Sequence, residues 1–175
     1  EVPPTEKNIE TSKKGQYRIK DNFLAFWFRF VYPMRSFIES DHPEIAMTKL
    51  KTGFIPNHVG YVYEDICRQK MWELNAQGKL PFLFDRVGRW WGGKDTEIDI
   101  VAIDTTDRSK IILGECKFHQ NVPMQLSELH QLKEKAAVVP WGNANRDEYF
   151  ALFCISGYSE DLQQLAQEDS HLLLM

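Results

Sequence analysis

The clearest pattern of hydrophobic and polar positions lies between residues 97 and 118. This segment, EIDIVAIDTTDRSKIILGECKF, contains two apolar runs separated by a charged, turn-forming interval. Residues 97–103 alternate polar and apolar side chains before becoming fully apolar, and residues 111–118 do the reverse. The pattern predicts an antiparallel β-hairpin.

The turn predicts the register of this hairpin. Symmetric closure about Asp107 gives three facing pairs: Ile103 with Ile111, Val101 with Leu113, and Asp99 with Glu115. Because side chains alternate with a period of two, Asp99, Glu115 and Lys117 are then expected on one face, at the open end. Two acids and a lysine are an unusual core but a suitable site for a divalent metal ion.

Helical patterns precede and follow the hairpin. Residues 21–40 begin with an Asp-Asn pair that can cap a helix, and Pro33 should interrupt that helix near Tyr32. After a short helix and a loop, Asn57 can cap a second helix that runs to about Gln77. Glu64 lies beside the apolar stripe of that helix, and composition alone predicts a solvated carboxylate there.

The remaining elements complete an α/β pattern. A first strand is expected within 81–91, a helix over 123–138, and a strand buried on both faces over 149–155. Because this last strand follows a crossover helix, it should run parallel to a strand of the hairpin. A short helix capped by Ser159 and a final strand at HLLLM follow. The order predicts a mixed sheet flanked by helices.

The chain divides into three segments. Residues 1–20 suggest a β-hairpin without a core of its own, which we expect to belong to a preceding domain. Residues 21–56 form an aromatic-rich helical segment, and 57–175 form the α/β domain. The aromatic helix is either a docking surface for another domain or a helix buried within this one, and the second is the commoner arrangement.

Composition narrows the class of protein. The 175 residues are 43% hydrophobic and 26% charged, as in ordinary globular proteins, and the apolar runs are too short to predict a membrane span. The three cysteines form no CxxC pair, which favours free thiols and a cytoplasmic location. A net charge of −4 argues against tight autonomous binding of nucleic acid, but not against an enzyme that uses metal ions and a basic partner.

The acidic residues of the hairpin suggest metal-dependent chemistry. Mg²⁺ binds hard oxygen ligands and usually takes one or two protein carboxylates, here Asp99 and Glu115, with the backbone carbonyl of Cys116 as a further candidate. Lys117 would orient a metal-bound water or stabilise the charge of the transition state. The alternative is a surface hairpin end with Glu97–Lys117 and Asp99–Lys117 ion pairs, each of small energy.

The motif resembles the PD-(D/E)XK nuclease superfamily. Asp99, fifteen intervening residues and then Glu115-Cys116-Lys117 follow its acid and E-x-K pattern, and the element order from residue 57 matches its αβββαβ core. Members often carry a glutamate on the first core helix, and Glu64 occupies that position. The resemblance implies a restriction-endonuclease-like fold, Mg²⁺ or Mn²⁺ as cofactor, and Glu64, Asp99, Glu115 and Lys117 as catalytic residues.

A closer resemblance covers most of the chain. It is similar to the C-terminal part of archaeal and bacterial AAA+-type ATPases known as domain of unknown function 234, on these segments: YRIKDNFLAFWFRFVYP, GYVYEDICRQ, GRWWGGKDTEIDIVAID and IILGECKF. In such proteins a P-loop ATPase and a winged helix precede this part, which implies that residues 1–20 end a winged helix. The sequence contains no GxxxxGK[ST] motif, so ATP is expected to bind only in an upstream domain.

Two functions therefore remain open. The first is a Mg²⁺-dependent phosphodiesterase that acts on DNA and is attached to an ATPase. The second is a nuclease-like module without catalytic activity that mediates protein interaction or regulates the ATPase, which the acidic net charge favours.

Overall fold

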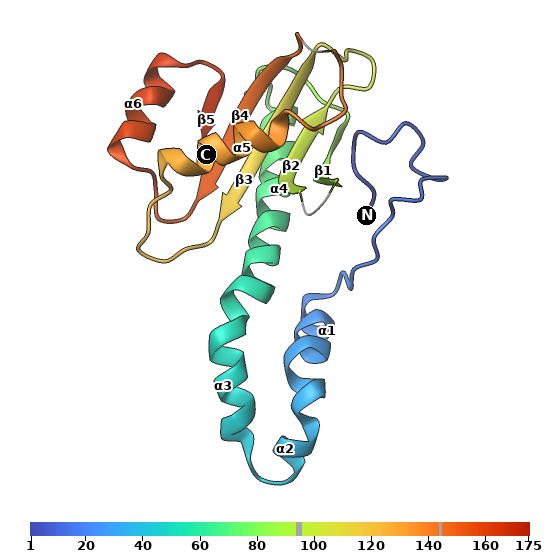
Figure 1. Cartoon of the computed structure of the whole chain (residues 1–175), viewed down its shortest axis with the longest axis vertical. Helices are drawn as coiled ribbons and strands as arrows, with labels where there is room; N and C mark the ends of the chain where they lie inside the picture. The colour runs from blue at the N-terminus through green and yellow to red at the C-terminus, as the bar shows by residue number, and fades with distance from the viewer. Residues whose placement is uncertain (94–95, 144) are drawn as a thin grey trace.

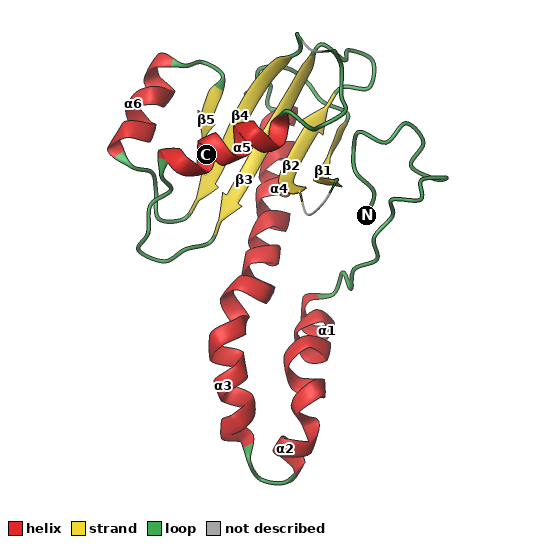
Figure 2. Cartoon of the chain, in the orientation of Figure 1, coloured by secondary structure: helices red, strands yellow, loops and turns green. Residues whose placement is uncertain are grey.

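A five-stranded mixed sheet forms the centre of the protein (Figures 1 and 2). The computed structural model describes residues 1–93, 96–143 and 145–175. The sheet order follows the chain: β1 (Arg86–Gly92), β2 (Thr96–Ile103), β3 (Lys110–Lys117), β4 (Asp147–Cys154) and β5 (Leu172–Leu174). β1, β2 and β3 pair antiparallel, whereas β3, β4 and β5 pair parallel. The predicted mixed α/β sheet is confirmed.

The predicted register of the central hairpin is also confirmed. Val101 of β2 lies opposite Leu113 of β3, as symmetric closure about Asp107 requires. β4 follows helix α5 (Leu126–Ala136) and runs parallel to β3, as the crossover rule predicts.

Helices cover both faces of the sheet (Figure 1). α5 and α6 (Glu160–Glu168) pack on one face, where their leucines join Val101 and Leu113 in one hydrophobic core. α4 (Gly60–Ala76) packs on the opposite face, where Cys67 and Met71 meet Ile112 in a second core. The central strands are apolar on both faces because both faces are covered.

β2 contains a bulge that changes the facing of its side chains. The pairing with β1 shifts between Gly88–Val101 and Trp90–Ile98, so two residues of β2 oppose Arg89. Ile98 and Val101 consequently both face α5, although strict alternation would place them on opposite faces. The two extra positions are Asp99 and Ile100, so the bulge lies at the candidate site.

A long helical hairpin extends away from the sheet (Figures 1 and 2). Its first arm contains α1 (Asn22–Phe26), a π-helix (Trp27–Val31), a 3₁₀-helix (Tyr32–Met34) and α2 (Arg35–Glu39). Its second arm contains α3 (Pro43–Phe54) and a π-helical turn (Ile55–Val59) that continues into α4. The predicted cap is confirmed, since Asp21 accepts the Leu24 N–H at 2.8 Å, and the helix is interrupted at Pro33 as expected.

The predicted loop before α4 is wrong, and Asn57 does not cap a new helix. The chain remains helical through Pro56 because a π-helical turn, in which the Gly60 N–H donates to the Ile55 carbonyl, accommodates the proline. α3 and α4 thus form one continuous helical arm, in which the helix is wider at the π-helical turn.

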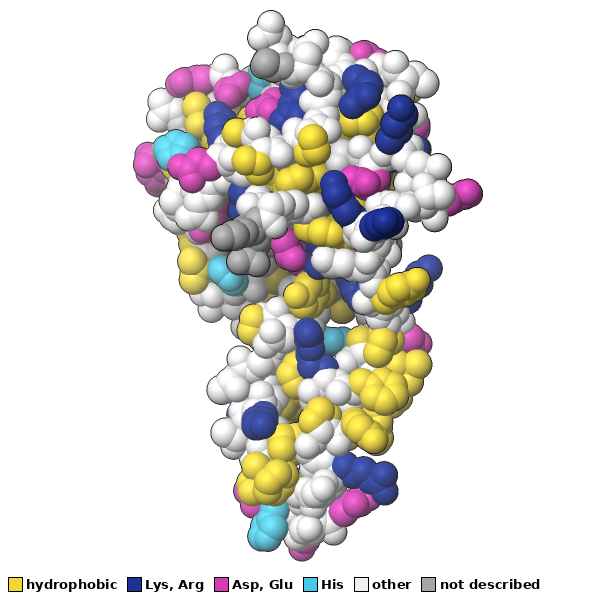
Figure 3. Space-filling view, turned by 45° about the vertical axis from the view of Figure 1, so that its right-hand side comes forward, with side chains coloured by type: hydrophobic (Ala, Val, Ile, Leu, Met, Phe, Trp, Pro, Cys, Tyr) yellow, Lys and Arg dark blue, Asp and Glu magenta, His cyan; other side chains and the backbone are white. Residues whose placement is uncertain are grey.

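The expectation that the aromatic helix is buried in the domain is also wrong. Phe23 is 66% exposed, Phe28 is 51% exposed and Tyr32 is 55% exposed. Figure 3 shows hydrophobic side chains gathered along the helical hairpin. The inner face of the hairpin is nevertheless packed, since Phe26, Phe30 and Phe54 form aromatic contacts between its arms.

Residues 1–20, all of which the structure describes, contain no β-strand, so the predicted hairpin is not formed as paired strands. Glu1 and Gln16 exchange backbone hydrogen bonds of 2.8 and 2.9 Å, which close the segment into a loop. This loop lies against β1: the Trp90 indole donates to the Thr5 hydroxyl at 3.0 Å, and Arg86 donates to the Glu6 carbonyl at 2.9 Å. The segment therefore packs on the edge strand of this sheet.

In the described ranges, no helix combines the length and the apolar character needed to cross a membrane.

Candidate functional site

Asp99 lies in the bulge of β2, where the paired part of β2 and β3 ends. Its Oδ2 accepts a hydrogen bond from the backbone N–H of Cys116 at 2.8 Å. The side chain thus takes the role that a backbone carbonyl of the neighbouring strand would have in a regular sheet. Burial raises the pKa of Asp99 to about 7, with further contributions from the nearby carboxylates of Glu115 and Glu64. A carboxyl with this pKa can exchange a proton near neutral pH, which is a property of functional sites.

Glu115 lies on β3, one residue beyond the paired part of the hairpin. Its side chain is buried. One carboxylate oxygen accepts a hydrogen bond from Lys117 Nζ at 2.6 Å, and the other accepts one from Lys135 Nζ at 2.9 Å. A buried carboxylate is stable when it is paired in this way. The sequence predicted Lys117 beside Glu115, whereas the expected ion pairs of Lys117 with Glu97 or Asp99 are absent from the described residues.

Lys117 and Cys116 complete the E-x-K segment. Burial alone would lower the pKa of Lys117, but Glu115 and Asp99 outweigh it and raise the pKa, so the side chain stays charged. A hydrogen bond with Cys67, together with burial, raises the pKa of the Cys116 thiol. The thiol therefore stays protonated in the core, and only the backbone of Cys116 is available to a ligand.

Glu64 is not the solvated carboxylate that composition predicted. It lies on the same face of α4 as the buried residues Cys67 and Met71, and its side chain is only 13% exposed. Arg89 of β1 donates to it at 2.6 Å, and Arg68 Nη1 lies 3.7 Å from the same oxygen. The structure thus brings Glu64 close enough to raise the pKa of Asp99, but pairs it with arginine.

Three basic residues of the site were not predicted: Lys135, Arg68 and Arg89. Lys135 comes from α5 and Arg89 from β1, and no local pattern links either to its partner. Arg68 could have been found, because it lies four residues after Glu64 and so on the same helical face. Arg68 also donates to the Asp99 carbonyl at 3.1 Å, which ties α4 to the bulge.

The donor chemistry of the site fits Mg²⁺. In the parts of the chain that the structure describes, no three His, Cys, Asp or Glu side chains are grouped to hold a metal ion. Asp99 and Glu115 nevertheless provide two hard carboxylates, which suffice for an ion that keeps several waters. Repulsion from Glu115 and Glu64 contributes to the raised pKa of Asp99, and a bound cation relieves such repulsion.

Comparison with known proteins places the chain among sequences of undefined activity. A family model for archaeal and bacterial proteins of unknown function matches residues 27–136. An uncharacterized protein of Methanocaldococcus jannaschii is 34% identical over 142 residues, which are 81% of this chain and 31% of that relative. The chain thus spans about a third of the length of the curated relative that it matches. No solved structure matches the chain significantly.

Proposed function

The chain belongs to this family, domain of unknown function 234, and we propose that it is a Mg²⁺-dependent phosphodiesterase that acts on DNA. The observation that carries the proposal is the grouping of a partly buried Asp99, whose pKa is raised to about 7, with Glu115 and Lys117 at the end of one β-hairpin. The resemblance of Asp99 and Glu115-Cys116-Lys117 to the PD-(D/E)XK pattern also supports a metal-dependent phosphodiesterase.

The element order supports a restriction-endonuclease-like core. Helix α4, strands β1 to β3, helix α5 and strand β4 follow one another in the chain, in the αβββαβ order of that fold. We also propose that this core has the restriction-endonuclease-like fold and that an ATPase with a winged helix lies upstream of it. The greater length of the Methanocaldococcus jannaschii relative leaves room for such domains.

Each residue has a distinct role in the proposed reaction. Asp99 and Glu115 would hold the metal ion, which lowers the pKa of a bound water and offsets negative charge on the phosphate. Lys117 would stabilise charge on the reacting phosphate, because its ammonium group is already held at Glu115. Lys135 would keep Glu115 oriented through their 2.9 Å pair, and Glu64 would adjust the proton affinity of Asp99.

The proposal is tested by a cleavage assay on the full-length protein, with its upstream region present, in Mg²⁺ or Mn²⁺. Asp99→Asn and Lys117→Ala should each lower cleavage by on the order of 100-fold or more, as loss of one stabilising group in the transition state does. Lys7→Ala, a change at an exposed lysine of the N-terminal segment, should cleave normally. Circular dichroism establishes that the variants remain folded. Wild-type protein that cuts neither DNA nor RNA and binds no divalent metal contradicts the proposal.

A second candidate function rests on the exposed aromatic side chains of the helical hairpin. These side chains suit a module that docks on other domains, with Glu115 and Glu64 kept in structural ion pairs. In that case Trp27→Ala and Phe28→Ala should weaken association with the upstream region, while Asp99→Asn leaves the behaviour of the protein unchanged. Gel filtration of the two parts expressed separately distinguishes the two functions.

A further inference from the structure

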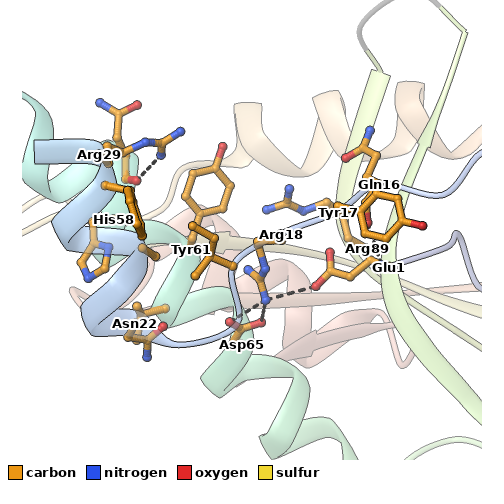
Figure 4. Close-up of a pocket in the computed structure, with 15 residues that line it drawn as sticks. Glu1, Gln16, Tyr17, Arg18, Asn22, Arg29, His58, Tyr61, Asp65 and Arg89 are labelled. Atoms are coloured by element: carbon orange, nitrogen blue, oxygen red, sulfur yellow. Dashed lines mark hydrogen bonds and ion pairs between the residues drawn. The ribbon is translucent and has the colours of Figure 1, made fainter. Parts of the chain in front are cut away.

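A cavity of about 510 Å³ lies beside the candidate site, between the N-terminal segment, α1, α4 and β1 (Figure 4). Its volume falls within the range of small-ligand sites. Three arginines from three separate segments line it: Arg18, Arg29 and Arg89. The net charge of the chain is −4, so this local concentration of arginine is not a general property of the surface.

Arg18 is held in place through its Nη2 atom. Its Nη2 donates to both carboxylate oxygens of Asp65, at 2.7 and 2.8 Å, and also lies 3.1 Å from Glu1. These pairs fix the N-terminal segment on α4 and thereby form one wall of the cavity. Arg18 therefore shapes the cavity.

Arg89 has an unused donor. Its side chain is 9% exposed and pairs with Glu64 through Nη2, yet its buried Nε has no hydrogen-bond partner among the described residues. A buried donor without an acceptor costs about 1–3 kcal/mol, so such atoms are rare in folded proteins. Because this Nε is itself shielded from solvent, an oxygen atom of a ligand in the cavity could accept its N–H only after a movement of the Arg89 side chain.

Arg29 has no carboxylate partner in the described part of the chain; its guanidinium donates only to the backbone carbonyl of Asn57. The guanidinium carbons of Arg29 and Arg89 lie 5.8 and 4.8 Å from the ring centre of Tyr61, which Figure 4 shows between them. Stacking on one ring holds two cations near each other. Glu64 balances the charge of Arg89, whereas Arg29 is paired with no carboxylate of the described residues.

Tyr17 adds an aromatic surface at the same cavity. It lines the same cavity as the three arginines, and the residue is fully exposed. Exposed aromatic rings next to arginines are typical of sites that stack nucleobases and bind the neighbouring phosphates.

We propose that this cavity binds the phosphate group of a nucleotide unit. Arg29 and Arg89 donate to the phosphate oxygens, and the base stacks on Tyr17. The ligand is either a free nucleotide or one unit of a single-stranded nucleic acid. The inference stands whether or not the site at Asp99 cleaves its substrate.

Calorimetric titration of the full chain in EDTA tests the inference without a metal ion at Asp99. The three probes are inorganic phosphate, a nucleoside 5′-monophosphate and a short single-stranded DNA oligonucleotide. Arg29→Ala should weaken binding of all three by on the order of 10-fold or more, because it removes a charged hydrogen bond. Tyr17→Ala should weaken the nucleotide and the oligonucleotide but not inorganic phosphate.

Arg35→Ala is the matched control, since Arg35 lies on the same arm of the hairpin, pairs with Glu39 and does not line the cavity. Equal affinity of the nucleotide and the oligonucleotide assigns a free nucleotide, and tighter binding of the oligonucleotide assigns a nucleic-acid strand. Absence of binding by all three probes at millimolar concentration overturns the inference. So does an equal loss of affinity in Arg29→Ala and Arg35→Ala.

Discussion

Asp99 owes its high pKa first to burial and then to the carboxylates of Glu115 and Glu64. All of these causes disfavour the charged form, and the N–H of Cys116 and the charge of Lys117 only partly oppose them. The charged form of Asp99 therefore lowers the stability of the folded state. A fold that needed only stability would place an uncharged side chain here.

Asp99→Asn is therefore expected to stabilise the protein in a pH-dependent manner. An acid whose pKa is higher in the folded than in the unfolded state costs stability as pH rises from its unfolded pKa, about 4, to its folded pKa, about 7. In EDTA, the gain from asparagine should be negligible near pH 4 and on the order of 4 kcal/mol above pH 7. Urea denaturation at several pH values measures it.

Asp107→Asn provides a control in which the expected change in stability has the opposite sign. Hydrogen bonds from the side chain and backbone of Ser109 lower the pKa of Asp107, so its charged form stabilises the folded state above pH 4. This variant should lose stability at neutral pH and lose none in strong acid. If Asp99→Asn shows the same gain at pH 4 and at pH 8, the account of Asp99 is wrong.

The sequence predicted which residues meet at the hairpin end but not how each is held. Turn symmetry was sufficient to place Val101 opposite Leu113, because register depends on local spacing. The bulge could not be predicted, since it arises from the pairing of β2 with β1. The burial of Glu64 was missed because the buried face of α4 is marked by Cys67 and Met71, whereas the strongly apolar Ile66 is 54% exposed.

At the scale of elements, Gly114 allows β3 to pack between its neighbours. A Cβ atom at this position would lie 2.9 Å from the Ala151 carbonyl oxygen and 3.0 Å from the Ile100 Cβ. Neither contact can relax without moving a central strand. The glycine therefore brings β2 and β4 close to β3 just before Glu115.

Gly114→Ala should destabilise the protein by about 1–3 kcal/mol, the usual cost of overpacking a core. The midpoint of urea denaturation measures this change. Gly15→Ala is the matched control, because a Cβ there would make only ordinary contacts of 3.8 and 3.9 Å. Equal stability of Gly114→Ala and Gly15→Ala contradicts this role of Gly114.

Prediction of elements failed mainly where helical geometry was irregular. Gly53 and Pro56 predicted a loop, but the π-helical turn carries the chain through the proline and joins α3 to α4. Such a turn depends on packing between the two arms, which a one-dimensional pattern does not contain. The strands were predicted more accurately, because apolar runs bounded by turn residues are local signals.

At the scale of the whole molecule, the sheet domain and the helical hairpin are stabilised by different sets of packed side chains. The sheet and its helices are held by two large apolar cores. The helical hairpin is held instead by a cluster of Phe26, Phe30, Phe54 and His58, in which Phe54 contacts each of the others at 5.5 to 6.2 Å between ring centres. Regions with few buried contacts open at lower free energy than the main core.

Phe54→Ala should therefore loosen the hairpin and leave the sheet intact. Loss of a large aromatic side chain from a core costs about 3–5 kcal/mol, less here because Phe54 is only half-buried. Hydrogen exchange measures the effect: amides of α1 and α3 should exchange faster, while those of β3 and β4 keep their protection. Phe37→Ala, at an exposed phenylalanine near the tip of the hairpin, should change neither set. Equal acceleration in the hairpin and the sheet would show that the two unfold as one unit.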